Sequence, residues 1–218
     1  MNISKLRFIL LGASVLSLAV VMGTLLWLKL TPRTIYYVPS DNSLEGLNRF
    51  GAVPDFSLTE RSGKNVKLAD LRGHIWIADF IYTSCTDTCP MQTATMAKLQ
   101  DQWANEANLQ FVSFSVDPAR DTRAVLSEYA GRYKADAKRW LFLTGGKEEI
   151  ARLVQEGFRL SAVPAPDGGV ESGVILHSPR FVLIDKQTQI RGYYDSRDPE
   201  ALARLKNDVA TLLKGKKE

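Results

Sequence analysis

Apolar and polar positions alternate along residues 50–218 with two periods, one typical of strands and one typical of helices. Strands are predicted at 75–82, 109–117, 140–144, 181–184 and 190–194. Helices are predicted at 90–103, 122–133, 147–157 and 199–213, and a hairpin of residues 53–58 and 66–68 precedes them. Asp121 or Thr122 is expected to cap the second helix. Strands that alternate with helices indicate a mainly parallel sheet covered on both faces, so the sequence predicts one α/β domain.

The N-terminal part of the chain has a different pattern. Residues 8–28 include no charged residue, and this run is long enough to cross a bilayer as a helix. A cleaved secretory signal peptide is the alternative, but its apolar region would be shorter and would end in small residues. We therefore expect an uncleaved membrane anchor at 1–30, a tether at 31–49 and a globular domain at 50–218.

The charges around this run account for the net charge of the chain, which is +4. Of 28 lysines and arginines, four flank the run, and the other 24 balance the 24 acidic residues. With few residues before the anchor, the simplest topology keeps the N-terminus in the cytoplasm. No transit peptide rich in arginine and serine precedes it, so we expect a single-pass protein of a bacterial inner membrane with its domain in the periplasm. A neutral domain without a basic stripe argues against nucleic-acid binding.

The two cysteines of the chain lie between a predicted strand and a predicted helix. Cys85 and Cys89 are four positions apart, and Pro90 follows the second. Proline suits the first position of a helix, so Cys89 is expected at the N-cap and Cys85 in the loop before it. The positive end of the helix would then favour the thiolate at both sulfurs, which is the form that attacks disulfides and binds metals.

Three uses of this pair are open. A structural disulfide is the simplest, but a bridge across so short a loop would constrain the unfolded chain little. A redox dithiol is the second, although the reactive pair of thioredoxin has two intervening residues rather than three. A soft-metal site is the third, because two thiolates select Cu(I), zinc or iron–sulfur clusters. Copper or zinc would need at least one more ligand, and the sequence contains two histidines, His74 and His177.

The predicted sheet indicates which other side chains could join the cysteines. Ligands gather at the carboxyl ends of strands, and Asp117 ends the strand that follows the cysteine strand. His177 lies just before the strand at 181–184, but sequence spacing alone does not show that it reaches the cysteines. His74 precedes the cysteine strand, so we expect it at the opposite end as a surface residue.

The methionines and the aspartate near the cysteines have simpler expected roles. Met91 and Met96 have soft sulfurs, but methionines on the apolar face of a helix usually belong to the core, and we expect both there. Asp87, between the cysteines, is expected to contact solvent or the N-terminus of the helix.

Three separated motifs resemble those of the Sco/SenC family of membrane-anchored copper chaperones. Residues 80–90 are similar to the cysteine motif of that family, with three residues between the cysteines and a proline after the second. Val116-Asp117-Pro118 is similar to its Val-Asp-Pro turn, and His177-Ser178 is similar to its histidine segment. The resemblance extends from about residue 53 to the end of the chain and includes the anchor.

This resemblance implies a thioredoxin-like fold with an N-terminal transmembrane helix and copper bound by Cys85, Cys89 and His177. It implies delivery of Cu(I) or Cu(II) to the dinuclear copper centre of cytochrome c oxidase subunit II, with a copper donor protein and a thioredoxin-like reductant as further partners. Two thiolates and one imidazole suit Cu(I), whereas a structural zinc normally has four ligands. Asp117 is a candidate for the outer shell of the metal, and a turn-forming role is its alternative.

The alternative function uses the same cysteines. A membrane-tethered thiol–disulfide oxidoreductase would act on the copper-ligand cysteines of the oxidase through Cys85 and Cys89, and it would not require His177. Peroxidase activity would need one exposed peroxide-reactive cysteine, and nothing in the sequence beyond the fold favours it. We expect a metallochaperone rather than an enzyme.

Overall fold

The computed structural model describes residues 17, 20–23, 45–160 and 179–215. The chain divides into two compact units, Met1–Pro39 and Ser40–Glu218. Across the described residues, no helix is both long and apolar enough to span a membrane. Most of the predicted anchor and of the predicted tether lies outside these residues, as does His177.

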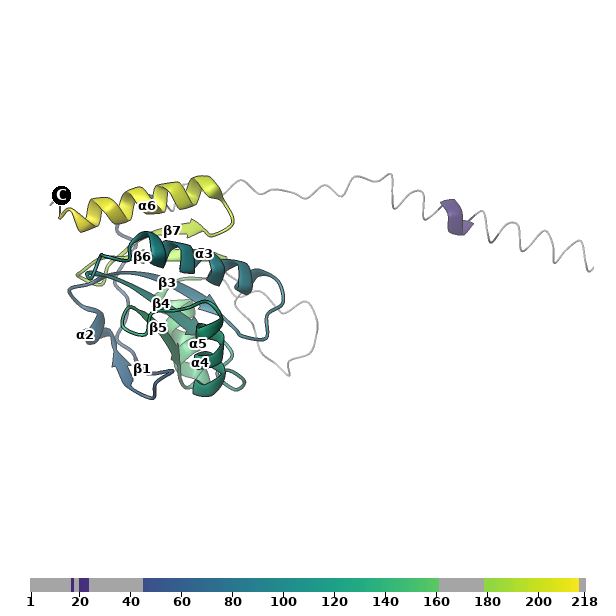
Figure 1. The fold of residues 1–218 in the computed structure, drawn as a ribbon, viewed down its shortest axis with the longest axis horizontal. Coiled ribbons are helices and arrows are strands. Elements are labelled where there is room, and N and C mark those ends of the chain that lie inside the picture. Colours follow the sequence, from purple (N-terminus) through teal and green to yellow (C-terminus); the bar gives the residue numbers. More distant parts are fainter. Residues whose placement is uncertain (1–16, 18–19, 24–44, 161–178, 216–218) are drawn as a thin grey trace, which may run out of the picture. The chain divides into compact units, whose positions relative to one another are not determined.

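The second unit is built on a seven-stranded sheet (Figure 1). Its strands are β1 (Ser57–Glu60), β2 (Asn65–Lys67), β3 (Ile75–Ile81), β4 (Leu109–Ser115), β5 (Trp140–Thr144), β6 (Arg180–Ile184) and β7 (Ile190–Asp195). Their order across the sheet is β2-β1-β5-β4-β3-β6-β7. Every residue of β3 is buried, as expected for a central strand that is covered on both faces. The predicted strands are confirmed, and the predicted hairpin is present with its first strand at Ser57–Glu60 rather than at 53–58.

The sheet is mixed, so the expectation of a mainly parallel sheet is wrong. β3, β4 and β5 are parallel to one another, whereas β1 is antiparallel to β2 and β5, and β6 is antiparallel to β3 and β7. The two outer hairpins give part of the reason. β1 and β2 are joined by residues 61–64 and β6 and β7 by residues 185–189, which are too few for the crossover that parallel strands need.

The helices are α2 (Leu68–Leu71), α3 (Thr88–Gln102), α4 (Arg123–Arg132), α5 (Lys147–Arg152) and α6 (Pro199–Leu213), with a π-helical turn η2 (Leu153–Gly157) after α5. The predicted helix at 147–157 therefore changes its hydrogen-bond pattern, and the N–H of Phe158 donates to the carbonyl of Leu153 at 2.9 Å. Thr122, not Asp121, caps α4 by accepting the N–H of Val125.

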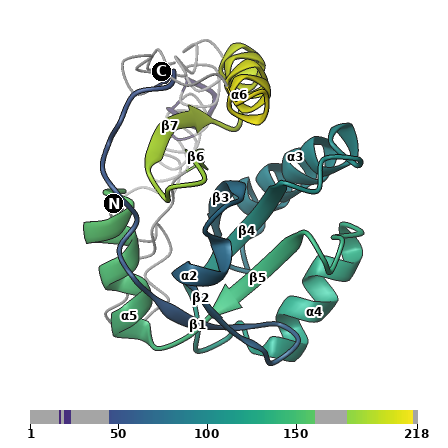
Figure 2. The same ribbon diagram turned by 90° about the vertical axis from the view of Figure 1, so that its left-hand side faces the viewer.

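Two hydrophobic cores cover the two faces of the sheet (Figure 2). Trp76, Ala78 and Phe80 of β3 face the core that includes α5. Ile77 and Ile81 face the core that includes α3, α4 and α6. This second core, which we call the helix-side core, also contains both cysteines.

The sheet has two ends that carry different features. β3 finishes at Ile81, just before the loop of Cys85, and the antiparallel strand β6 begins beside it at Arg180. At the opposite end β3 begins at Ile75, and β6 leads into the turn at 185–189. We call these the cysteine end and the turn end.

Residues 45–51 contact β7 and α6 through an ion pair and hydrogen bonds. Glu45 forms an ion pair with Arg204 of α6. Arg191 of β7 donates to the backbone carbonyls at positions 47 and 48, both at 2.8 Å. Phe50 donates to the carbonyl of Ile190 at 2.9 Å, close to the turn end.

Candidate functional site

A short loop joins the cysteine strand to α3. The N–H of Cys85 donates to the carbonyl of Tyr82 at 3.1 Å and closes a turn in this loop. α3 begins at Thr88 with Asp87 as its N-cap, so Cys89 is the second residue of the helix and Pro90 the third. The expectation that Cys89 is the N-cap is therefore wrong by two residues. The whole first turn lacks intrahelical N–H partners, so it accommodates proline at the third position as well as at the first.

Both cysteines are free and buried, with 7% of Cys85 and 4% of Cys89 exposed. The N–H of Cys89 donates to the sulfur of Cys85 across 3.4 Å. This contact places the Cys85 sulfur against the first turn of α3. Each sulfur also belongs to the helix-side core, where it packs among apolar side chains.

The two thiols differ in acidity. Burial acts to raise the pKa of Cys85, but hydrogen bonds from the backbone of Cys89 and Asp87 outweigh it, and the pKa is lowered overall. Burial raises the pKa of Cys89 far above its usual range, and negative charge on Cys85 raises it further. The expectation that both sulfurs favour the thiolate is therefore wrong for Cys89. Helix amides stabilise the anion at Cys85 only, and the core penalises it at Cys89.

Asp79 is a functional candidate that the sequence analysis missed. It is fully buried in β3, and side-chain alternation directs it to the helix-side core. Among the described residues, neither of its carboxyl oxygens has a hydrogen-bond partner by distance and angle, and the neighbouring Ser113 hydroxyl offsets only part of the effect of burial on its pKa. Burial raises its pKa to about 7, and its charge in turn contributes to the high pKa of Cys89. The available signal was a single charged residue within an apolar strand.

Asp117 lies at the same end of the sheet as the cysteines. It follows β4, and the adjacent Val116 donates its N–H to the carbonyl of Ile81 at 2.9 Å, which joins the two strand ends. The side chain of Asp117 is mostly buried and pairs with Arg120 at 3.4 Å. Its backbone carbonyl accepts the N–H groups of Arg120 and Asp121. These contacts are those of a turn-forming residue beside the cysteine loop.

The segment that follows His177 also reaches this end. Arg180, the first residue of β6, accepts a hydrogen bond at its carbonyl from the side chain of Gln92 in α3, at 3.3 Å. Pro179 accepts the N–H of Ser196 at 2.7 Å. The chain two and three residues after His177 therefore lies beside the first turns of α3, while His177 itself is outside the described residues.

The other candidate residues, His74, Met96 and Met91, lie in three different surroundings. His74 precedes β3 at the turn end, as expected. Met96 is fully buried in the helix-side core, as expected. Met91 is 54% exposed, so the expectation that it belongs to the core is wrong. It lies in the first turn of α3, on the side opposite the buried Cys89.

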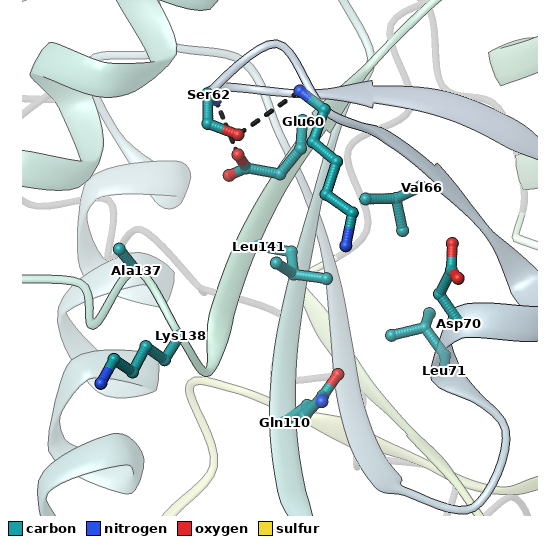
Figure 3. A pocket seen from close by; sticks show the side chains of 10 residues that line it. Glu60, Ser62, Val66, Asp70, Leu71, Gln110, Ala137, Lys138 and Leu141 are labelled. Atoms are coloured by element: carbon teal, nitrogen blue, oxygen red, sulfur yellow. Dashed lines mark hydrogen bonds between the residues drawn. The ribbon is translucent and has the colours of Figure 1, made fainter.

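One pocket of about 230 Å³ lies elsewhere, near the β1–β2 hairpin (Figure 3). Glu60, Val66, Leu71 and Gln110 are among the side chains that line it. Gln110 is at the start of β4, which pairs with the start of β3 at the turn end. The pocket is therefore at the opposite end from the cysteines, and no cysteine, histidine or methionine lines it.

The chemistry of the cysteine end follows from these contacts. The lowered pKa of Cys85 favours its thiolate, the form that acts as a nucleophile or a soft-metal ligand, and Cys89 must lose a proton before it joins either reaction. Among the described residues no cluster of three or more cysteine, histidine or acidic side chains surrounds a metal position.

Comparisons with known proteins match the chain to one family. A family model described as SCO1/SenC matches residues 46–214. A SCO1 protein homolog of Bacillus subtilis (strain 168) is 34% identical over 145 residues, which cover 66% of this chain and 73% of that protein.

Two solved structures are similar to the second unit. BsSco, described as a Sco-family cytochrome c oxidase assembly protein with a disulfide switch, has a TM-score of 0.65 and 31% identity, over 78% of this chain and 96% of that one. Copper-bound ScoI of Bradyrhizobium japonicum has a TM-score of 0.58 and 27% identity, over 72% and 99%. The expected thioredoxin-like, mixed α/β fold is confirmed.

Proposed function

The chain belongs to the SCO1/SenC family, and from that membership we propose that it is a membrane-anchored copper chaperone for cytochrome c oxidase. The recipient in this proposal is the dinuclear copper centre of subunit II. Copper-bound ScoI supports copper as the cargo, and the description of BsSco supports oxidase assembly as the process. A copper donor protein and a thioredoxin-like reductant are the further partners that we propose.

The proposed copper ligands are Cys85, Cys89 and His177. The contact between Gln92 and the carbonyl of Arg180 carries this assignment, because it holds the start of β6 against α3. His177 is three residues before Arg180, and three extended residues span at most about 10 Å. Two thiolates and an imidazole suit Cu(I), and the imidazole also favours Cu(II). We place Asp117 outside the ligand set, as a residue that shapes the adjacent turn.

The proposed location is the bacterial inner membrane. Residues 8–28 support it, because they are long and apolar enough to form a single-pass anchor. The domain would then face the periplasm, where an oxidase subunit could receive copper.

A second candidate function is a membrane-tethered thiol–disulfide oxidoreductase. The unequal acidity of the two thiols favours it, since Cys85 would attack a disulfide as a thiolate and Cys89 would resolve the mixed disulfide. The disulfide switch described for BsSco is consistent with redox-active cysteines. The two functions share both cysteines and differ in their need for His177.

One substitution separates them. In His177→Ala the third ligand is lost, so we expect the full-length protein in detergent to hold Cu(I) less tightly and to fail to stabilise Cu(II), while it still reduces a disulfide substrate. His74→Ala is the matched control, because this histidine lies at the turn end, and it should bind copper as the unmodified protein does. Copper content, the Cu(II) absorption spectrum and disulfide reduction are the measurements.

The opposite result would displace the chaperone function. If His177→Ala binds copper and supports oxidase assembly normally while Cys85→Ser abolishes function, the redox function is the better account. Copper binding should also require the dithiol, because a disulfide has no thiolate to donate. Tight Cu(I) binding by the oxidised protein would therefore refute the ligand assignment.

A further inference from the structure

We propose that Asp121 is a positioning residue for the cysteine site. Its buried carboxylate joins the segment before Cys85 to the segment that contains Asp117 through hydrogen bonds. Asp121 is fully buried, lies in the loop between β4 and α4, and does not cap that helix. Its side chain is instead directed at two other segments of the chain.

The first segment is the start of the cysteine loop. The hydroxyl of Thr83 donates to Oδ1 of Asp121 at 2.5 Å, and the N–H of Thr83 lies 3.2 Å from both carboxyl oxygens. Thr83 is two residues before Cys85 and follows Tyr82, whose carbonyl accepts the N–H of Cys85. Asp121 therefore holds both the backbone and the side chain of the residue from which the cysteine turn starts.

The second segment is the end of β4. The hydroxyl of Ser115 donates to Oδ2 of Asp121 at 2.6 Å. The oxygen of that same hydroxyl accepts the N–H of Asp117 at 3.2 Å, and the N–H of Asp121 donates to the carbonyl of Asp117 at 2.9 Å. One carboxylate thus connects the turns of Cys85 and Asp117, which leave two neighbouring parallel strands.

A carboxylate suits these contacts. An ionised carboxyl group accepts only, and here it faces three donors, two hydroxyls and one backbone N–H. An asparagine in the same place has one accepting oxygen in place of two, and one hydroxyl would have to reverse and accept from its NH₂ group. The isosteric change Asp121→Asn should therefore weaken the connection with little change in side-chain volume.

The clamp formed by Thr83, Asp121 and Ser115 should favour the reduced cysteines. In the dithiol the Cys85 sulfur accepts the N–H of Cys89 at 3.4 Å, and forming the disulfide would bring that sulfur to the Cys89 sulfur and away from this contact. This contact depends on the position of the cysteine turn, which the clamp fixes through Thr83. Loss of the clamp should therefore weaken the dithiol state relative to the disulfide.

The test measures the equilibrium between dithiol and disulfide in the full-length, copper-free protein. Oxidation transfers two electrons and two protons from Cys85 and Cys89 to glutathione disulfide, forming the protein disulfide and two glutathione molecules. Thr83→Val and Asp121→Asn should each shift the equilibrium about fivefold to tenfold toward the disulfide, the size of one hydrogen bond's contribution expressed as an equilibrium constant. Thr83→Ser retains the hydroxyl and should stay near the unmodified value.

Asp185→Asn is the matched control. Asp185 is also a buried carboxylate that accepts three hydrogen bonds, from two turn amides and Arg191, but it lies at the turn end. Its substitution should lower the melting temperature without moving the dithiol equilibrium. Thr83→Val retains the volume of threonine, so it keeps the test valid should Asp121→Asn not fold.

Two outcomes would overturn the inference. One is a Thr83→Val equilibrium equal to that of Thr83→Ser, and the other is a shift of the same size in Asp185→Asn, which would reveal general destabilisation. Only the role of the cysteine site as a copper site depends on the proposed function; the effect of Asp121 on the dithiol equilibrium does not. If the unmodified protein fails to bind Cu(I) while the clamp variants still shift the equilibrium, the chaperone proposal fails and the clamp stands.

Discussion

Each end of the sheet has a buried carboxylate, and the two differ in their hydrogen-bond partners. At the turn end Asp185 accepts the N–H groups of Gln187 and Gln189, both at 2.9 Å, and pairs with Arg191 at 3.1 Å. Toward the cysteine end Asp79 is more deeply buried, yet among the described residues its oxygens have no hydrogen-bond partner.

The contrast shows that Asp185 stabilises the fold, whereas ionised Asp79 destabilises it. A buried carboxylate with a complete set of donors holds a turn in place, whereas one without donors destabilises the fold when it ionises. A contribution to stability therefore accounts for the presence of a carboxylate at Asp185 and does not account for one at Asp79. Asp79 shares the helix-side core with Cys89, and its charge raises the pKa of that thiol, so its effect is felt at the cysteine site.

Breaking the turn end should have the largest effect on stability. Arg191→Met leaves Asp185 as a buried charge without its cation, and we expect the free energy of unfolding to fall by about 3–5 kcal/mol. Urea unfolding measures this loss. Arg152→Met, which removes an exposed arginine, is the control and should change stability little. Equal effects of the two substitutions would show that the turn end does not depend on its buried pair.

Removing the charge of Asp79 should have the opposite sign. The pKa of this carboxyl is about 7 in the folded protein and near 3.8 in the unfolded chain, so between pH 4 and 7 only the unfolded chain releases the proton. Stability therefore falls as pH rises through this window, by up to about 4 kcal/mol. Asp79→Asn cannot ionise and should be more stable than the unmodified protein at pH 8.

Unfolding curves between pH 4 and pH 8 test this prediction. The stability of Asp79→Asn should depend less on pH than that of the unmodified protein, and Asp185→Asn should be destabilised throughout. An unchanged pH dependence in Asp79→Asn would show that Asp79 is already ionised in the fold at low pH. The contrast between the two carboxylates would then disappear.

The smallest expected effect concerns the two thiols of the cysteine end. Because the pKa of Cys85 is lowered and that of Cys89 is raised, iodoacetamide should alkylate Cys85 at least about tenfold faster at pH 7. Mass spectrometry of the alkylated peptides measures both rates. Cys85→Ser and Cys89→Ser identify each rate separately, and equal rates in the two variants would contradict the assigned asymmetry.

The sequence was sufficient for the elements and for the position of the cysteines. Apolar runs located β3 and β5, and the period of α6 located its ends, because burial on one or both faces controls these patterns. The three short motifs around the cysteines, Asp117 and His177 together identified the family. These features depend on residues that are close together in the chain.

Features that depend on distant contacts were not predictable. The pKa of Cys89 is set by the core around it, and the sequence shows only its place at a helix start. The hydrogen bond between Thr83 and Asp121 joins residues 38 positions apart, so Asp121 could be expected only as a helix cap. Met91 is exposed although Cys89 in the same helical turn is buried, and the sequence does not show which side of this turn other elements cover.

The attachment of residues 45–51 also has a mechanical consequence. A force that pulls on the chain ahead of Glu45 is resisted first by the ion pair with Arg204, then by Arg191 and by the pairing of Phe50 with Ile190. All of these contacts transmit the force to α6 and β7. β7 is an edge strand, and β6 lies between it and β3. Tension on the N-terminal segment therefore enters the sheet at its margin, two strands away from β3, the strand that leads into the cysteine loop.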